Sequence, residues 1–171
     1  MLEIIEGYDR LDDVRELFAE YTAMLVSIDP SFQLYLDIQH YGEEERNPSR
    51  KYMKPEGKLY LSLLDGKIAG CIALRKLDDE KCEMKRLYVR PEYRGHGIAT
   101  ALVEKILEDA AELGYSWIYL DTLPELQSAV ELYEKLGFER TECYNDSPSS
   151  NTLFYRRKIS GNSSSIDNSE L

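Results

Sequence analysis

The sequence predicts a single domain of the mixed α/β class, and three observations support this prediction. Two strand-like runs, Lys58–Leu64 and Lys67–Lys76, flank an Asp65-Gly66 pair, which is a strong signal for a β-hairpin. A third strand-like run, Lys81–Val89, passes through a glycine-containing turn into a helical segment, Thr100–Leu113. The chain has 171 residues, of which 43% are hydrophobic and 31% charged, and this is enough for one domain to bury a sizeable core.

The segment before the hairpin is predicted to be mainly helical. Residues Leu2–Ile5 form a short strand-like run. Between Leu11 and Ser27 apolar residues recur at helical spacing, and the Asp29-Pro30 pair ends this helix. A polar loop is expected over Gly42–Ser49. The apolar residues between these two segments predict a second, shorter helix, and they are Phe32, Leu34, Tyr35, Leu36 and Ile38.

The segment after the glycine turn contains one more helix and three more strands. Residues Trp117–Thr122 are β-branched or aromatic and predict a strand, and Ala129–Phe138 predicts a helix. Two further strands, Glu139–Tyr144 and Thr152–Ile159, are expected around a turn-rich loop over residues 145–150. The tail, Ser160–Leu171, is polar and poor in apolar residues, and this composition predicts disorder.

The segment Leu87–Thr100, which passes from strand to helix through the turn Arg94–Ala99, is the most informative stretch of the chain. Glycines at 95 and 97 allow a sharp bend at a helix start and leave successive N–H groups pointing outward. With the positive end of the helix dipole behind them, these donors suit a phosphate or pyrophosphate. The turn and the strand before it carry four cations in a chain of formal charge -11, namely Lys85, Arg86, Arg90 and Arg94. The alternative interpretation is an ordinary turn with solvated arginines.

Two familiar phosphate-binding loops do not fit this turn. A Walker loop requires a Gly-Lys-Ser/Thr ending, which this chain lacks. A dinucleotide-binding fingerprint requires a third Gly or Ala at the position that Thr100 occupies here.

Composition and charge exclude several other classes of function. A net charge of -11 argues against binding to nucleic acid. No apolar run approaches the roughly 20 residues that span a bilayer, and the N-terminus lacks the features of a signal peptide, so we expect no membrane partner and a cytoplasmic location. Cys71, Cys82 and Cys143 form no CxxC pair and only two histidines are present. Free thiols in a reducing compartment and no metal site are therefore expected.

The hexamer Arg94–Ala99 resembles the acetyl-coenzyme A signature of the GNAT family of N-acetyltransferases, Arg/Gln-x-x-Gly-x-Gly/Ala. Arg94, Gly97 and Ala99 stand at its defining positions. Downstream, Ala129–Phe138, AVELYEKLGF, is similar to the second helix of the same family, and the strand WIYLDT to its fifth strand.

The resemblance covers Leu2 to Ile159 in the order of elements, and its motifs lie between Glu83 and Phe138. It implies the GNAT acyl-CoA N-acyltransferase fold, with a central, mainly antiparallel sheet flanked by helices. We therefore expect a GNAT domain over residues 1–159 and a separate polar tail over residues 160–171.

The resemblance also implies acetyl-CoA as the donor co-substrate. It assigns the pantetheine arm and the thioester carbonyl to the main chain of Leu87, Tyr88 and Val89. It assigns the pyrophosphate to the loop and helix start, namely Arg94, Gly95, His96, Gly97, Ile98, Ala99 and Thr100. The chain departs from the family at Leu126, where many relatives have an Asn that contacts the cofactor; the nearest amide is Gln127.

Glu83 is the candidate general base. It lies eleven positions before Arg94 (94 minus 83), where many members of the resembled family carry a glutamate that deprotonates the amine through ordered water. The alternative is a solvated strand glutamate balanced by Lys85. Strand alternation places Glu83 on the same face as Leu87 and Val89 unless a bulge intervenes.

Tyr133 is the candidate general acid. The resemblance directs its phenol at the coenzyme sulfur, and the alternative is a core ring, because Ala129, Leu132, Tyr133 and Leu136 share helical spacing. His96 has a suitable reference pKa for a base, but its position between two glycines favours an exposed or phosphate-neighbouring role.

The predicted function is acetyl transfer from acetyl-CoA to a primary amine by direct attack in a ternary complex. The acceptor is expected to be a small molecule or a peptide, and the protein a monomer or homodimer. An aromatic and acidic acceptor pocket is considered, from Tyr21, Phe32, Tyr35, Tyr41, Tyr52 and Tyr144 with Asp29, Asp37, Glu43, Glu44, Glu45 and Asp146. The favoured alternative is that these tyrosines are core or surface residues and that the acids solvate loops. Two alternatives stay open: a non-catalytic acetyl-CoA sensor or interaction module, and a transferase that uses another acyl-CoA.

Overall fold

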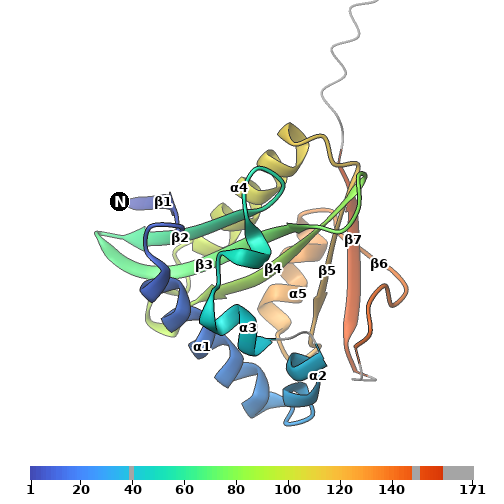
Figure 1. Cartoon of the computed structure of the whole chain (residues 1–171), viewed down its shortest axis with the longest axis horizontal. Helices are drawn as coiled ribbons and strands as arrows, with labels where there is room; N and C mark the ends of the chain where they lie inside the picture. The colour runs from blue at the N-terminus through green and yellow to red at the C-terminus, as the bar shows by residue number, and fades with distance from the viewer. Residues whose placement is uncertain (39–40, 148–150, 160–171) are drawn as a thin grey trace, which may run out of the picture.

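The protein folds around one seven-stranded mixed sheet, seen in a computed structural model that describes residues 1–38, 41–147 and 151–159 (Figure 1). The strand order is β1-β2-β3-β4-β5-β7-β6. Every neighbouring pair is antiparallel except β4 and β5, which are parallel. The predicted mixed, mainly antiparallel sheet is therefore confirmed. The elements are β1 (Leu2–Glu6), α1 (Leu11–Ile28), α2 (Phe32–Ile38), α3 (Tyr41–Arg46), η1 (Arg50–Tyr52), β2 (Lys58–Leu64), β3 (Lys67–Lys76), β4 (Lys81–Val89), η2 (Pro91–Tyr93), α4 (Ile98–Glu112), β5 (Trp117–Thr122), α5 (Gln127–Lys135), β6 (Glu139–Arg140) and β7 (Leu153–Lys158).

The helices cover both faces of this sheet. In Figure 1 the blue and cyan helices α1, α2 and α3 lie in front of the sheet, and α4 and α5 lie behind it. Each face has its own apolar core. The front core packs Val14, Leu17 and Phe18 of α1 against β2 and β3, and the rear core packs Leu102 and Ile106 of α4 against β3, β4 and β5. Burial of these apolar faces is the main force that holds the layers together.

The hairpin predicted from Asp65 and Gly66 is present. Both residues have positive φ values, 51° and 79°, as a two-residue type I′ turn requires. Leu64 pairs with Lys67 across it, and the remaining pairs follow in register along β2 and β3 except for one shift between Ser62 and Leu63.

A β-bulge at Arg86 interrupts β4. The φ of Arg86 is 60°, and the pairing with β3 shifts between Cys71 and Ala73. Because of the extra residue, Lys85 and Tyr88 face the same side of the sheet, opposite Ala73 and Cys71 of the front core. The bulge that would separate Glu83 from Leu87 and Val89 is therefore present: Glu83 faces the front, whereas Leu87 and Val89 pack on the rear core.

The bulge is held by a buried ion pair with α3. The Arg86 guanidinium donates to both carboxylate oxygens of Glu44, at 3.0 and 2.5 Å, and the side chains are 4% and 2% exposed. The Tyr52 hydroxyl also donates to Glu44. Burial alone would disfavour the ionised carboxylate, but the charge of Arg86 and these hydrogen bonds outweigh it, and the pKa of Glu44 falls to about 2.

Two sequence predictions are corrected here. The expected polar loop over Gly42–Ser49 contains α3, which is stabilised by acidic residues in its first turn and Arg46 in its last. The expected strand Glu139–Tyr144 is shorter, because β6 pairs with β7 only at Glu139 and Arg140. The chain then leaves the sheet, with Thr141 N–H bonded to Phe154 C=O. Part of the predicted 145–150 loop and all of the predicted tail lie outside the described residues.

Helix boundaries shift by a few residues from their predicted positions. The helix α4 starts at Ile98, because Gly97 in the left-handed conformation serves as its N-cap. The helix α5 ends at Lys135, and Gly137 with φ of 87° turns the chain away.

Among residues 1–38, 41–147 and 151–159, no helix has the length and apolarity needed to cross a membrane. The same part of the chain holds no group of three or more His, Cys, Asp or Glu placed to bind a metal ion. Cys71, Cys82 and Cys143 are free thiols.

We predict that Glu44→Gln lowers the free energy of unfolding by about 3 kcal/mol, because it leaves the Arg86 guanidinium buried without its counter-charge. Urea denaturation at pH 7 measures this change. Glu43→Gln is the matched control: it removes the same charge from an exposed position of the same helix, and we expect a change within about 0.5 kcal/mol. Equal losses in the two variants would contradict the anchoring role.

The same ion pair gives stability a pH dependence. The pKa of Glu44 is about 2 in the folded protein against an ordinary 4.5, so its contribution is present above pH 4.5 and is lost as the pH falls towards 2. The free energies of unfolding of wild type and Glu44→Gln, measured as a function of pH, should therefore converge at low pH. Above pH 4.5 they should differ by the full contribution of the ion pair.

Candidate active site

The site forms where the two parallel strands of the sheet separate. β4 and β5 pair only at three positions, Lys81–Glu83 with Trp117–Tyr119. Beyond Glu83 the strands diverge, as Figure 1 shows. From the bulge to Val89, the β5-facing edge of β4 consequently pairs with no strand among the described residues. This open edge can accept and donate hydrogen bonds to an extended ligand, as an added strand would.

A groove of about 750 Å³ runs along this open edge towards the start of α4. Nine of the ten predicted cofactor-binding residues line it, and they are Leu87, Tyr88, Val89, Arg94, Gly95, Gly97, Ile98, Ala99 and Thr100. His96 is the exception: its ring is exposed, with Nδ1 3.0 Å from the Tyr93 carbonyl oxygen. The structure therefore brings the predicted strand and loop residues together in one cavity.

The loop at the end of the groove has the form of an anion-binding site. Gly95 and Gly97 have φ values of 84° and 73°, and a Cβ on either would meet nothing within 4 Å. Their conformation, and not tight packing, therefore requires glycine. No side chain caps α4, a helix of 15 residues, so its first N–H groups and the positive end of its dipole face the groove.

The four cations noted in the sequence do not form one cluster. Only Arg94 lines the groove, where its Nε donates to the Val89 carbonyl at 3.0 Å. Arg90 binds Glu20 and Glu16 of α1. Lys85 and Arg86 line a different, smaller cavity.

This second cavity lies between β4, β5 and the α1–α2 region. Four residues line both cavities, and they are Tyr21, Leu87, Thr122 and Tyr133. These residues mark the junction at which a group bound in the groove would meet a group bound in the smaller cavity.

Tyr133 on α5 stands at this junction. The ring is 5% exposed and contacts the rings of Phe138 and Tyr155, with centroids 5.8 and 6.4 Å away. Burial, with smaller contributions from Tyr21 and Asp121, raises the pKa of Tyr133 well above its ordinary value, so the phenol stays protonated at neutral pH. Tyr133 therefore belongs to the core and also borders both cavities. The two interpretations made from the sequence, a core ring and a general acid, are compatible.

Glu83 is a buried carboxylate with several donors. It is 1% exposed, and it accepts from Arg75 Nε at 2.7 Å and from the Tyr144 hydroxyl at 2.5 Å. Lys85 Nζ lies 3.8 Å from its Oε1. Burial opposes ionisation, but the charges of Lys85 and Arg75 and these hydrogen bonds lower the pKa of Glu83. The solvated glutamate considered from the sequence is therefore wrong, although its pairing with Lys85 is correct.

The structure adds residues that the sequence did not single out. Tyr144 joins Glu83 over 61 positions of sequence, and its ring packs on Tyr119 and Phe154. Arg75 pairs with Glu83 across β3 and β4, which the hairpin and strand alternation could have indicated. The groove is also lined by Leu126 and Gln127, at the position where the chain departs from the family pattern.

The smaller cavity does not have the acidic lining considered from the sequence. Among the described residues its lining includes Tyr21 and Phe32, and its charged members are Lys85, Arg86 and Asp121. Glu44, which was one of the candidate acids, is instead paired with Arg86.

Three comparisons with known proteins agree on one family. The model of the acetyltransferase (GNAT) family matches residues 12–138. An uncharacterized N-acetyltransferase of Schizosaccharomyces pombe is 39% identical over 152 residues, which cover 88% of this chain and 89% of the relative.

Solved structures show the same fold. A GNAT-family acetyltransferase of Staphylococcus aureus has a TM-score of 0.75 at 23% identity and covers 94% of this chain and 100% of its own. The PaiA N-acetyltransferase of Thermoplasma acidophilum, solved in complex with coenzyme A, has a TM-score of 0.70 at 17% identity and covers 92% and 99% of the two chains.

We predict that Tyr144→Phe lowers the free energy of unfolding by about 1–2 kcal/mol, because Glu83 loses a donor to its buried charge. Chemical denaturation at pH 7 measures the loss. Tyr119→Phe is the matched control, because it removes a hydroxyl from the ring that packs edge-to-face on Tyr144, with centroids 5.0 Å apart. A larger loss in the control than in Tyr144→Phe would show that the contact with Glu83 is unimportant for stability.

Proposed function

Because the chain belongs to the acetyltransferase (GNAT) family, we propose that it transfers the acetyl group of acetyl-CoA to a primary amine by direct attack in a ternary complex. Enzymes of this family are acetyl-CoA-dependent acyltransferases, and the chain is an N-acetyltransferase of this kind.

The meeting of two cavities at Tyr133 is the observation that carries this proposal. A direct attack requires donor and acceptor to be held side by side, with their reacting atoms about 3–3.5 Å apart. The groove and the smaller cavity, which is about 20 Å³, share Tyr21, Leu87, Thr122 and Tyr133, so the acyl end of a donor in the groove would adjoin a space that admits an amino group. No acyl-cysteine is needed, and Cys82 is buried.

In this proposal the donor lies along the open edge of β4. The main chain of Leu87, Tyr88 and Val89 pairs with the amides of the pantetheine arm, and a backbone N–H there polarises the thioester carbonyl. The glycine loop and the uncapped start of α4 receive the pyrophosphate, with Arg94 at the same end of the groove. The geometry of loop and edge fits a long ligand with an anionic end.

We place the general base at Glu83, which is hydrogen-bonded to the half-buried Tyr144; neither residue lines the groove or the smaller cavity. The Tyr144 hydroxyl donates to Glu83 Oε2, so a proton taken up by the phenol oxygen can be passed to the carboxylate as the phenol proton moves over. Since the pKa of Glu83 is lowered by Lys85 and Arg75 despite its burial, the carboxylate holds such a proton only briefly. Because Glu83 is only 1% exposed, an amine cannot reach it directly, and in this proposal the relay through Tyr144 carries the proton instead.

We place the general acid at Tyr133. A phenol that stays protonated at neutral pH can donate a hydrogen bond or a proton to a thiolate as it leaves. The raised pKa of Tyr133 and its place between the two cavities support this assignment.

The proposed catalytic domain comprises residues 1–159, followed by a polar tail over residues 160–171. We also propose a cytoplasmic location, supported by the three free thiols. A small-molecule or peptide amine as the acceptor, with no nucleic-acid partner, is consistent with the net charge of -11. The monomeric and homodimeric states both remain compatible with this function.

We predict that acetyl-CoA and coenzyme A each raise the melting temperature and that ATP does not. At 100 times its dissociation constant, a ligand stabilises the fold by about 2.7 kcal/mol. Thermal scanning with the three ligands measures binding, and thiol release against a panel of amines then measures transfer. Binding without transfer would favour the sensor hypothesis, and binding of neither coenzyme would overturn the assignment of the groove.

We predict that Tyr133→Phe lowers kcat by about a hundredfold, in the range expected for a general acid, while the melting temperature changes little because the ring is kept. Tyr155→Phe is the matched control: this ring lies 6.4 Å away and lines neither cavity, and we expect kcat within about twofold of wild type. An unchanged kcat in Tyr133→Phe would remove the acid role.

A further inference from the structure

Three hydroxyls meet where the two cavities join. Tyr21, Leu87, Thr122 and Tyr133 line both the groove and the smaller cavity, and all of them except Leu87 carry a hydroxyl. Tyr21 belongs to α1, Thr122 ends β5 and Tyr133 belongs to α5. Three elements that are far apart in the sequence therefore each bring to the junction a group that can donate one hydrogen bond and accept others.

None of these three hydroxyls has a hydrogen-bond partner among the described residues. Tyr21 is half-buried, and Thr122 and Tyr133 are 8% and 5% exposed. In the same part of the chain, the unpartnered hydroxyls that are also shut off from open space are those of Thr22 and Ser62. The three hydroxyls of the junction are not shut off in this way, so each still borders open space and is available to a ligand or to water.

The two phenol groups lie in the same electrostatic surroundings. Burial is the main reason that the pKa of Tyr21 rises to about 12, while Arg86 lowers it and Asp121 raises it. Burial also raises the pKa of Tyr133 well above its ordinary value, and Tyr21 and Asp121 raise it further. Because Asp121 lines the smaller cavity, its influence on both phenols indicates that their oxygens lie near this cavity.

The charged side chains of the smaller cavity are bound to other parts of the protein. Arg86 donates to both carboxylate oxygens of Glu44, and Asp121 accepts from Asn145 Nδ2 at 2.7 Å. The hydroxyls are therefore the side-chain groups at the junction that the protein leaves for a ligand.

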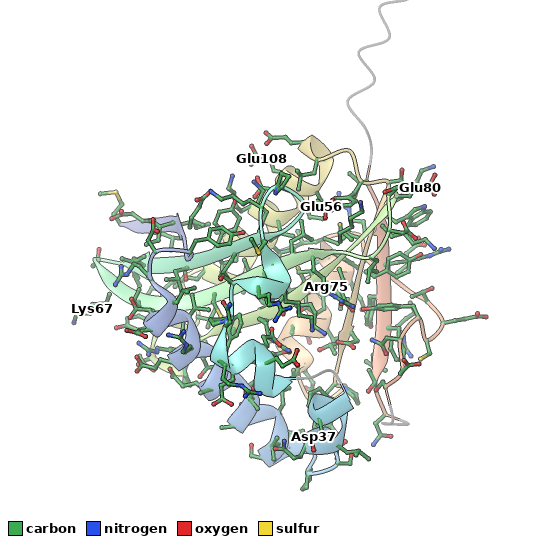
Figure 2. The ribbon with its side chains drawn as sticks, in the orientation of Figure 1. Asp37, Glu56, Lys67, Arg75, Glu80 and Glu108 are labelled. Carbon is green, nitrogen blue, oxygen red and sulfur yellow. The ribbon has the colours of Figure 1, made fainter. Side chains whose placement is uncertain are left out.

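The carboxylate that we assign as the general base lies beside the junction and not at it. Arg75, labelled in Figure 2, pairs with Glu83 across β3 and β4, and Lys85 Nζ lies 3.8 Å from the same carboxylate. Neither Arg75 nor Glu83 lines either cavity. Residues other than Glu83 must therefore hold the amine while it reacts.

The smaller cavity has room for about one amino group. Its volume is about 20 Å³, and a cavity needs about 10–15 Å³ to hold one water molecule. An amino group is similar in size to water, whereas the carbon skeleton of an acceptor is larger. The skeleton must therefore stay outside this cavity, and only the amino group can enter it.

The chemistry of a neutral primary amine matches two of the hydroxyls. Such an amine has two N–H donors and one lone pair, and the oxygens of Tyr21 and Thr122 can each accept one N–H. When both N–H groups are held in this way, the lone pair remains free to attack a thioester carbon in the groove beside Leu87. Hydroxyls carry no charge, so they do not favour the unreactive ammonium form as a carboxylate would.

Resting on the function proposed above, we propose that Tyr21 and Thr122 hold the amino group of the acceptor at the junction, each by accepting one of its two N–H groups, and that the acceptor must be an unsubstituted primary amine. A methyl group on the nitrogen replaces one N–H and removes its hydrogen bond, which leaves a hydroxyl unsatisfied. The smaller cavity also has no room for the added carbon. Tyr133 remains free to donate to the sulfur as it leaves.

The first test compares primary amines with their N-methyl derivatives. Glycine is paired with N-methylglycine, ethylamine with N-methylethylamine, and 1,4-diaminobutane with its N,N′-dimethyl derivative, and release of coenzyme A is measured for each. In every pair that is turned over, we expect kcat/KM of the primary amine to be higher by about a hundredfold or more, because a site built around a hydrogen bond rejects an analogue that lacks it. Comparable values for the N-methyl amines would overturn this proposal and leave the acetyltransferase function intact.

The second test removes each hydroxyl and keeps the shape of the side chain. Tyr21→Phe and Thr122→Val should each lower kcat/KM of the primary amine by about tenfold, the effect of one hydrogen bond. The N-methyl amine still uses the remaining hydroxyl, so the ratio of kcat/KM between the two amines should fall by the same factor. A merely structural role would not change this ratio, and a variant that keeps the wild-type ratio would overturn the role of its residue.

Thr22→Val is the matched control for both variants. The Thr22 hydroxyl also lacks a partner, and it lies next to Tyr21 on α1, but it is shut off from open space and lines neither cavity. We expect kcat/KM and the ratio between the amines to stay within about twofold of wild type, as for a substitution away from the site. Acetyl-CoA should raise the melting temperature equally in all three variants; loss of this shift in Tyr21→Phe or Thr122→Val would assign the hydroxyl to the donor and contradict the proposal.

A binding measurement separates this inference from the proposed function. Ethylamine at pH 9 should raise the melting temperature of the protein saturated with coenzyme A, and N-methylethylamine should not. This shift should disappear in Tyr21→Phe and Thr122→Val and persist in Thr22→Val. If no amine is acetylated but the shifts behave in this way, the proposed transfer fails and the amine site stands; equal shifts with the two amines, or none with either, would refute the site.

Discussion

The buried pair between Arg86 and Glu44 is the contact on which the arrangement of the site depends. It fixes a bulge in the middle of β4, and the bulge decides which side chains face which layer. Before it, Glu83 and Lys85 face the front helices. After it, Leu87 packs on the rear core. Without the extra residue, the side chains of β4 would simply alternate between the two faces of the sheet. Glu83 and Lys85 would then lie on the same face as Leu87 and Val89.

The divergence of β4 from β5 supplies the second constraint. Pairing that continued past Glu83 would satisfy the backbone of Leu87 to Val89 and close the groove. The two strands instead separate, and Tyr133 of α5 lies where the groove meets the smaller cavity. The cost of unpaired backbone groups is tolerable only where water or a ligand can reach them, so the open edge is itself an indication of a binding surface.

Local signals in the sequence were enough for the hairpin, for β5 and for the glycine loop, because each depends on neighbouring residues. The Asp65-Gly66 turn requires two positive φ values, and the strand Trp117–Thr122 is marked by its own composition. The helix α3 was missed because its anchor is a contact 42 positions away. Tyr144 was not assigned to Glu83 because 61 positions separate them. Such contacts depend on the assembled sheet and have no local signature.

The charge of the smaller cavity could not be predicted from the sequence either, and the reason is energetic. A chain of net charge -11 with many acids in its first helices made an acidic pocket one of two interpretations, beside acids that only solvate loops. Solvent, however, accommodates most of these acids at little cost, as at Glu43 and Glu45, which are exposed. The cations are held inside by the sheet, where the dielectric is low and each unbalanced charge has a larger effect. A cavity therefore takes its character from the few charges that burial retains, such as Lys85 and Arg86, and not from the sum over the chain.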